Sequence, residues 1–187
     1  MEDPPRERRI DDGLFGVVVV EGWSDVCHLY ERALVALGAD DTETARGLYR
    51  QALDLEPTNA QGHIGLGTCA LQEKKFELAS RSYRDALALD AESASAHVGL
   101  GSVHYQQRRF AASAEHYKHA VRLREDLPDA HWGAASAFQA LGDRGAMRTH
   151  AARFLALAPD STLVPRARAM LAISALRFAL RRLFSPY

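Results

Sequence analysis

A repeat of 34 residues constrains this chain more than any other feature of its sequence. Residues 60–93 and 94–127 align without a gap: HIGLG corresponds to HVGLG, and SYRDALAL corresponds to HYKHAVRL. The spacing extends to residues 26–59 and 128–161, so that the thirtieth position of every frame is a leucine (Leu55, Leu89, Leu123, Leu157). A fixed period of this length predicts a stack of identical supersecondary units.

Each frame has the pattern of two helices. Apolar residues recur at spacings of three and four, and small residues such as Gly67 and Gly101 occupy equivalent positions where two helices must approach closely. Connections of two to five residues require the paired helices to be antiparallel. We therefore expect helices at about residues 24–37, 42–55, 60–73, 76–90, 94–107, 110–124, 128–141 and 144–157.

This pattern resembles the tetratricopeptide repeat family, and the resemblance covers residues 26–161. It implies an all-α fold: a right-handed α-solenoid of four helix pairs, 26–59, 60–93, 94–127 and 128–161, within a domain spanning 23–161. The residues that carry it are the Leu-Gly steps Leu66-Gly67 and Leu100-Gly101, the second-helix aromatics Tyr49, Tyr83 and Tyr117, and the closing prolines Pro57 and Pro159.

The two ends of the chain differ from the repeats. We expect an N-terminal arm, 1–22, whose residues 1–13 are disordered, because they are charged and contain two prolines. Residues 14–20, LFGVVVV, favour an extended strand and are too short to span a bilayer. This apolar segment can fold onto the first helices, or it can fill the repeat groove or pair with a partner.

The C-terminal segment, 162–187, is basic, because residues 161–187 contain five arginines and no acidic residue. We expect a ninth helix at about 163–184 that covers the open end of the stack, as a solenoid requires. The stretch from Arg177 to Phe184 also has the pattern of a basic amphipathic helix. Peripheral contact with an anionic membrane surface is the alternative to simple capping.

No motif predicts catalysis, a metal or a cofactor. The repeated His63, His97 and His131 are expected to lie about one helix width apart and to pack in the core, because one ion cannot bridge that distance. A net charge of −1 gives no signature of nucleic-acid binding. Two cysteines without CxxC spacing fit a reducing compartment, so a cytoplasmic location is expected. Arginine outnumbers lysine 20 to 3, which favours a GC-rich and hence bacterial source.

The resemblance also implies a binding surface. In tetratricopeptide proteins the first helix of each pair lines the concave groove, and ligands meet its positions 2, 5, 6, 9, 12 and 13. In repeat one this register gives Tyr30, Leu34 and Leu37, and it places Gly65, Gly99, Gly133 and Ala140 in the groove as well. The candidate site residues are Gln61, Ile64, Thr68, Leu71 and Gln72, then Ser95, Val98, Ser102, Tyr105 and Gln106, then Asp129, Trp132, Ser136 and Gln139.

This groove lacks the lysine, arginine and asparagine of carboxylate-binding co-chaperones, and it has glycine where sugar-transferase arrays carry an asparagine ladder. Its apolar and small polar surface suits an extended peptide or a helix with apolar anchors, with Tyr105 and Trp132 as the expected hot spots. We expect a non-enzymatic protein-interaction scaffold or adaptor. The alternative is a cytoplasmic chaperone for an apolar export substrate, similar to class II type III secretion chaperones. A second copy of the chain is a further possible partner, so that the protein would form a homo-oligomer.

Overall fold

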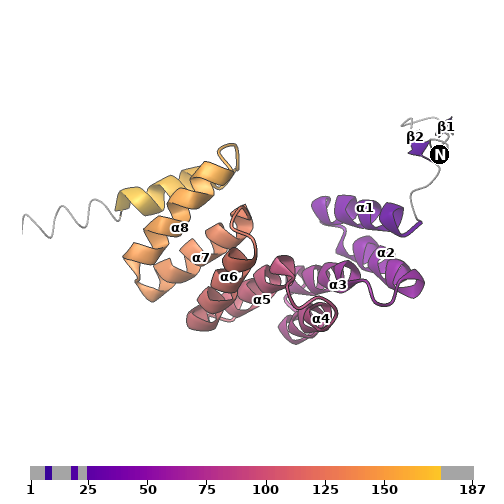
Figure 1. The fold of residues 1–187 in the computed structure, drawn as a ribbon, viewed down its shortest axis with the longest axis horizontal. Helices are drawn as coiled ribbons and strands as arrows, with labels where there is room; N and C mark the ends of the chain where they lie inside the picture. The colour runs from indigo at the N-terminus through magenta and orange to yellow at the C-terminus, as the bar shows by residue number, and fades with distance from the viewer. Residues whose placement is uncertain (1–6, 10–17, 21–24, 174–187) are drawn as a thin grey trace, which may run out of the picture.

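The computed structural model describes residues 7–9, 18–20 and 25–173 of the chain. Within these ranges the fold is four antiparallel helix pairs stacked into an arc, followed by a further helix at 164–173 (Figure 1). The prediction of an all-α solenoid with four helix pairs and a terminal helix is confirmed. The paired helices are α1 Asp25–Gly38, α2 Thr42–Leu55, α3 Ala60–Gln72, α4 Phe76–Leu89, α5 Ala94–Gln106, α6 Phe110–Leu123, α7 Pro128–Leu141 and α8 Arg144–Leu157.

Several helices begin at a side chain that accepts a hydrogen bond from the first turn. Asp41 accepts from the Thr44 amide at 3.1 Å, Asn59 from the Gln61 amide at 3.0 Å, and Asp143 from the Ala146 amide at 3.0 Å. Such caps satisfy amides that have no partner within the helix. The beginnings of α2, α3 and α8 are therefore encoded locally.

The turn inside each pair has one residue with left-handed backbone. Four residues spaced by 34 occupy this position, with φ of 64° at Asp40, 58° at Lys74, 61° at Arg108 and 79° at Gly142. The amide that follows each of them bonds back five residues, for example from Arg109 to the His104 carbonyl at 2.8 Å. This is the Schellman ending of a helix, which favours glycine because a side chain is disfavoured at positive φ.

The core consists of small residues from both helices of a pair and large aromatic residues from the second helix. Ala45, Ala79 and Ser113 share one repeat position and are completely buried. The Ser113 hydroxyl donates to the Gly101 carbonyl at 2.8 Å, so its burial leaves no unpaired donor. Because α3 packs on α5 and α5 on α7, the first helices form one continuous layer.

The C-terminal helix covers the last pair in its described part, 164–173. Val164, Ala167 and Met170 are buried, and Met170 packs in one cluster with Ala135 and Met147. The rest of the expected helix to residue 184, with the basic stretch from Arg177, lies outside the described residues. No helix among the described residues is long and apolar enough to cross a membrane.

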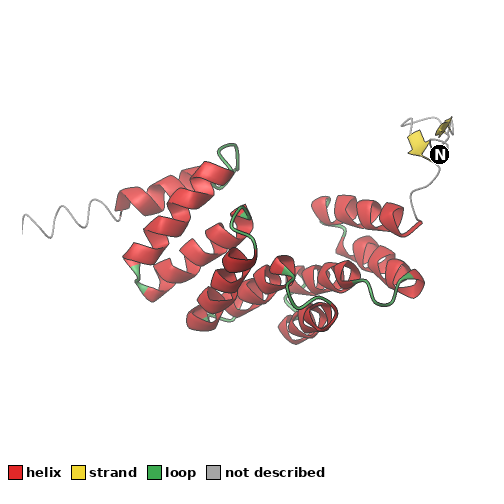
Figure 2. Ribbon diagram, viewed as in Figure 1, coloured by secondary structure: helices red, strands yellow, loops and turns green. Residues whose placement is uncertain are grey.

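The N-terminal region contains a short antiparallel hairpin of β1 Glu7–Arg9 and β2 Val18–Val20, with Arg8 opposite Val19 (Figure 2). β2 lies within the segment for which the sequence predicts a strand. The expectation that residues 1–13 lack regular structure is wrong at residues 7–9. The backbone pairing that forms β1 joins residues 9 to 13 positions apart, and the charged sequence ERR does not by itself predict a strand. The remainder of the arm lies outside the described residues.

Candidate functional site

The fourteen predicted groove residues lie on α3, α5 and α7, the helices of the continuous first-helix layer. They divide into two groups by exposure. The exposed group consists of Tyr105 and polar residues: Gln61, Gln72, Ser95, Gln106, Asp129 and Gln139. The half-buried group holds the apolar and hydroxyl residues: Ile64, Thr68, Leu71, Val98, Ser102, Trp132 and Ser136. The face that a ligand can reach is therefore more polar than the sequence indicates.

The hydroxyls of the half-buried group already have partners inside the fold. Thr68 Oγ1 donates to the Ile64 carbonyl at 3.0 Å and lies 3.1 Å from the hydroxyl oxygen of Tyr83. Ser102 Oγ lies 3.0 Å from the Val98 carbonyl and 2.9 Å from the hydroxyl oxygen of Tyr117. These two side chains hold the tyrosines of the second helices in place, so their first role is structural.

Three glycines that the sequence places in the groove are buried instead. A Cβ atom added to Gly65, Gly99 or Gly133 would lie less than 3.0 Å from the ring of Tyr49, Tyr83 or Tyr117, in that order. Each tyrosine comes from the second helix of the preceding repeat. The assignment of these positions to the ligand surface is wrong, because each one is the seat of a tyrosine ring.

The tyrosines also contact the first helix of their own repeat. A Cβ on Gly67 would lie 2.8 Å from the Tyr83 ring, and one on Gly101 would lie 3.0 Å from the Tyr117 ring. Tyr83 is therefore held between Gly67 of its own repeat and Gly99 of the next. Desolvation raises the pKa of Tyr83 and Tyr117 to about 12.

The two expected hot spots have different environments. Tyr105 is 37% exposed at the end of α5, and its ring forms a T-shaped contact with Phe110 at a centroid distance of 5.4 Å. Trp132 is half-buried and packs on Phe154 of α8, with centroids 5.3 Å apart. Tyr105 is thus available to a ligand, whereas Trp132 contributes to packing between α7 and α8.

The three histidines at the equivalent repeat position are partly or fully buried in the fold. His131 is buried, and His63 and His97 are half-buried. His131 Nε2 lies 3.0 Å from the Glu125 carbonyl oxygen, and each of His97 and His131 contacts a second histidine on the partner helix. Among the described residues, no group of three or more histidine, cysteine, aspartate or glutamate side chains is arranged to hold a metal ion.

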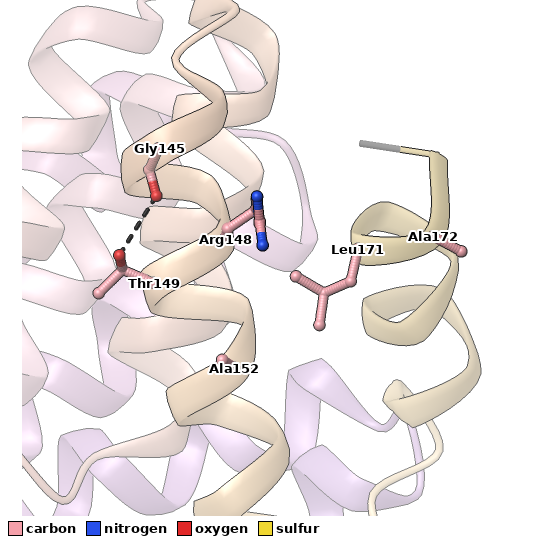
Figure 3. Close-up of a pocket in the computed structure, with 6 residues that line it drawn as sticks. All are labelled: Gly145, Arg148, Thr149, Ala152, Leu171 and Ala172. Carbon is pink, nitrogen blue, oxygen red and sulfur yellow. Dashed lines mark hydrogen bonds between the residues drawn. The ribbon is translucent and has the colours of Figure 1, made fainter. Parts of the chain in front are cut away.

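Two cavities flank α8, away from the predicted groove. The first, of about 690 Å³, lies between α8 and the C-terminal helix. Figure 3 shows Arg148 of α8 and Leu171 of the C-terminal helix pointing towards each other across it, while Thr149 Oγ1 donates to the Gly145 carbonyl at 3.2 Å. Its lining contains one charged side chain and no nucleophile paired with a base. Its lining residues lie on α8 and the C-terminal helix, whereas the predicted groove residues lie on α3, α5 and α7.

The second cavity, of about 540 Å³, lies between α6 and α8. Its lining includes Glu125, His131, His150 and Arg153, and it shares Thr149 and Ala152 with the first cavity. None of the predicted groove residues lines either of these two cavities. The sequence does not predict these cavities, because they depend on how the second helices and the terminal helix pack.

Comparisons with known proteins agree with this architecture. Two family profiles described as tetratricopeptide repeat match residues 36–97 and 71–128. No curated protein shows significant sequence similarity to the chain.

Solved structures with the same fold include a thermophilic tetratricopeptide protein of Thermus thermophilus, 20% identical with a TM-score of 0.71, where the match covers 81% of this chain and 84% of that one. The first tetratricopeptide domain of Spaghetti bound to an HSP90 peptide is 19% identical with a TM-score of 0.56, over 63% of this chain and 93% of that one.

The O-GlcNAc transferase of Thermobaculum terrenum is 26% identical with a TM-score of 0.64, over 73% of this chain but 27% of that protein. Four observations lead to one assignment: the 34-residue period, the tyrosine rings packed on glycines, the family profiles and the solved structures. This chain is a tetratricopeptide repeat protein.

Proposed function

We propose that the protein is a non-enzymatic scaffold that binds an extended or helical polypeptide on the first-helix face of α3, α5 and α7. The observation that carries this proposal is the exposure of Tyr105 on a face whose other exposed candidate residues are four glutamines, one serine and one aspartate. Large amphipathic rings contribute most per residue at interfaces, and amide side chains supply donors and acceptors for a peptide backbone.

The charge of this face supports a ligand other than an acidic tail. Among the candidate site residues Asp129 is the one charged side chain, and none is lysine or arginine. The solved Spaghetti domain holds the peptide SRMEEVD, which is acidic. A ligand of this chain instead binds through apolar anchors and backbone hydrogen bonds, so its affinity depends weakly on salt.

The scaffold proposal can be tested with a peptide selected from a displayed library against the full chain and then titrated by calorimetry. Tyr105→Ala should weaken binding about 5- to 150-fold, which corresponds to 1–3 kcal/mol. Leu78→Ala is the matched control, because Leu78 is a similarly exposed apolar residue on α4. Equal affinity of wild type and Tyr105→Ala, or a loss in the control alone, would move the binding site off this face.

The role of Trp132 is separated from that of Tyr105 by its packing. Trp132→Ala removes a ring that contacts Phe154, so lost binding could reflect lost structure. Trp132→Phe keeps most of that contact, and on the present proposal it weakens peptide binding less than Tyr105→Ala. If Trp132→Phe is the more damaging change while its melting temperature matches wild type, the ligand is anchored on α7 instead.

The alternative, a chaperone for an apolar export substrate, predicts a different measurement. Such a protein would suppress aggregation of an unfolded apolar polypeptide at a stoichiometric ratio, whereas a scaffold recognises a defined peptide. An aggregation assay on wild type and Tyr105→Ala therefore separates the two functions.

A further inference from the structure

Two pairs of histidines occupy the same register in consecutive repeats. Nδ1 of His97 on α5 lies 3.3 Å from Nδ1 of His116 on α6. Exactly one period later in the sequence, Nδ1 of His131 on α7 lies 3.1 Å from Nδ1 of His150 on α8. In the second repeat the corresponding residues are His63 and Ser82. The histidine pairs therefore belong to the third and fourth repeats.

The pair on α5 and α6 is part of a longer row of imidazoles. His104 stacks on His116 with ring centroids 5.2 Å apart, and His119 lies 4.2 Å from His97. Arg122 lies 2.8 Å from His119 Nδ1 and, as a guanidinium, must be the donor. At most one proton fits between two facing Nδ1 atoms, so each pair is stable only while at least one member is neutral.

The charged groups around these pairs come from α4, α6, α8 and the turns next to α6. For the row on α5 and α6 they are Arg84 of α4, Arg109 of the turn and Arg122 of α6. For His131 and His150, Lys118 of α6 faces the pair, and Glu125 and Arg153 line the adjoining cavity. Protonation of both members of a pair would add two cations to surroundings that are already mainly positive.

Desolvation is the largest cause of the change in pKa, followed by the neighbouring histidines and cations. The pKa of His97 falls to about 4, and the pKa values of His104, His116 and His150 also fall below their ordinary value. In the unfolded chain these histidines bind protons near pH 6.5. The stability that these histidines contribute is therefore fully present above about pH 6.5, and it is lost as the pH drops from there towards 4.

We propose that the two histidine pairs make the third and fourth repeats an acid-sensitive half of the solenoid, which opens in mildly acidic solution while the first two repeats stay folded. The remaining histidines among the described residues, His28 and His63, have no such imidazole partner. A solenoid permits this division, because each repeat contacts only its neighbours and can open without the rest.

The second repeat shows which residue can replace the second histidine of each pair in a test. His116→Ser with His150→Ser gives the third and fourth repeats the serine that the second repeat has as Ser82. The unfolding constant of wild type should rise between about pH 7.5 and pH 5 by roughly tenfold for each pair. The double variant should lack most of this rise. His63→Ser removes a histidine outside the pairs and should behave as wild type. Comparing each protein with itself at the two pH values cancels any loss caused by the substitution alone.

Hydrogen exchange locates the effect. Protection factors, corrected for the intrinsic pH dependence of exchange, should fall in α5–α8 of wild type at about pH 5 and stay high in α1–α4. Nitrogen-15 resonances of the wild-type imidazoles supply a readout that does not need a folded variant. His97 and His116 should remain neutral at a pH at which a histidine in an unstructured peptide is already protonated. Ordinary titration of both residues, an equal pH response of wild type and double variant, or a loss of protection confined to α1–α4 would overturn the proposal.

Discussion

Gly99 offers the sharpest test of how the repeats interlock. A methyl group added at Gly99 would lie less than 3.0 Å from ring carbons of Tyr83. The ring cannot move aside, because Tyr83 is 2% exposed and its other neighbour is Gly67, where an added Cβ would lie 2.8 Å away. The Tyr83 hydroxyl is also held by Thr68 at 3.1 Å.

The magnitude follows from two opposing terms. Alanine is the better helix former by about 1 kcal/mol, and overpacking of a close-packed core costs about 1–3 kcal/mol or more. An added Cβ at Gly99 would lie 2.3 Å from the Tyr83 ring, so the overpacking cost is at the upper end of this range. Gly99→Ala should therefore lower the free energy of unfolding by about 2 kcal/mol, or the melting temperature by roughly 4–8 °C. Gly47→Ala is the matched control, because Gly47 lies inside α2 and an added Cβ would meet nothing within 4 Å. It should raise stability by about 0.5–1 kcal/mol.

A double-mutant cycle identifies the ring as the cause. In a Tyr83→Ala background the space that the ring fills is empty, so Gly99→Ala should become neutral or stabilising. The measurement is urea unfolding followed by circular dichroism. Two results would contradict this reasoning. One is that Gly99→Ala stabilises the wild-type protein as much as Gly47→Ala does, and the other is that Gly99→Ala still destabilises the protein when Tyr83 is alanine.

Two further predictions concern backbone strain and alkaline pH. Arg108 and Gly142 share the left-handed turn position, so Arg108→Gly should raise the free energy of unfolding by about 0.5–1 kcal/mol and Gly142→Ala should lower it by about 1 kcal/mol. Opposite signs in urea unfolding support this reasoning, and equal signs contradict it. Burial raises the pKa of Tyr49, Tyr83 and Tyr117 to about 12, so the stability that these phenols contribute is present below about pH 10 and lost as the pH rises to 12. Their phenolate absorbance should therefore appear together with loss of the helical signal, and ionisation while the helices persist would refute it.

Much of the fold follows from the sequence by itself, because its determinants are local and recur four times. The helix bounds agree with those expected to within one or two residues, since capping side chains such as Asp41 and Asn59 and the turn residues lie beside the helix ends that they define. Hydrophobic spacing then requires antiparallel pairs. The pairing of Glu7–Arg9 with Val18–Val20 was missed because neither strand alone specifies its partner.

The candidate site was predicted less well, because exposure depends on which side chains meet across repeats. A signal was nevertheless present. A glycine follows each of three tyrosines at a distance of sixteen residues: Gly65 after Tyr49, Gly99 after Tyr83 and Gly133 after Tyr117. The fourth repeat has Ala151 at the tyrosine position, and the residue sixteen positions later is Ala167, which is buried. Each of the three tyrosine rings lies against its glycine, which is the size matching of a close-packed interface.

The tertiary structure decided how the two expected hot spots differ. The fourth repeat has Phe154 where the other three repeats have Ala52, Ala86 and Ala120, so a ring is present to pack on Trp132. Tyr105 stays accessible at the end of α5, in a T-shaped contact with Phe110. The histidine pairs likewise exist only because antiparallel helices bring together residues 19 positions apart. The sequence determined the repeating frame through local propensity and period, and packing between helices determined which side chains are left for a partner.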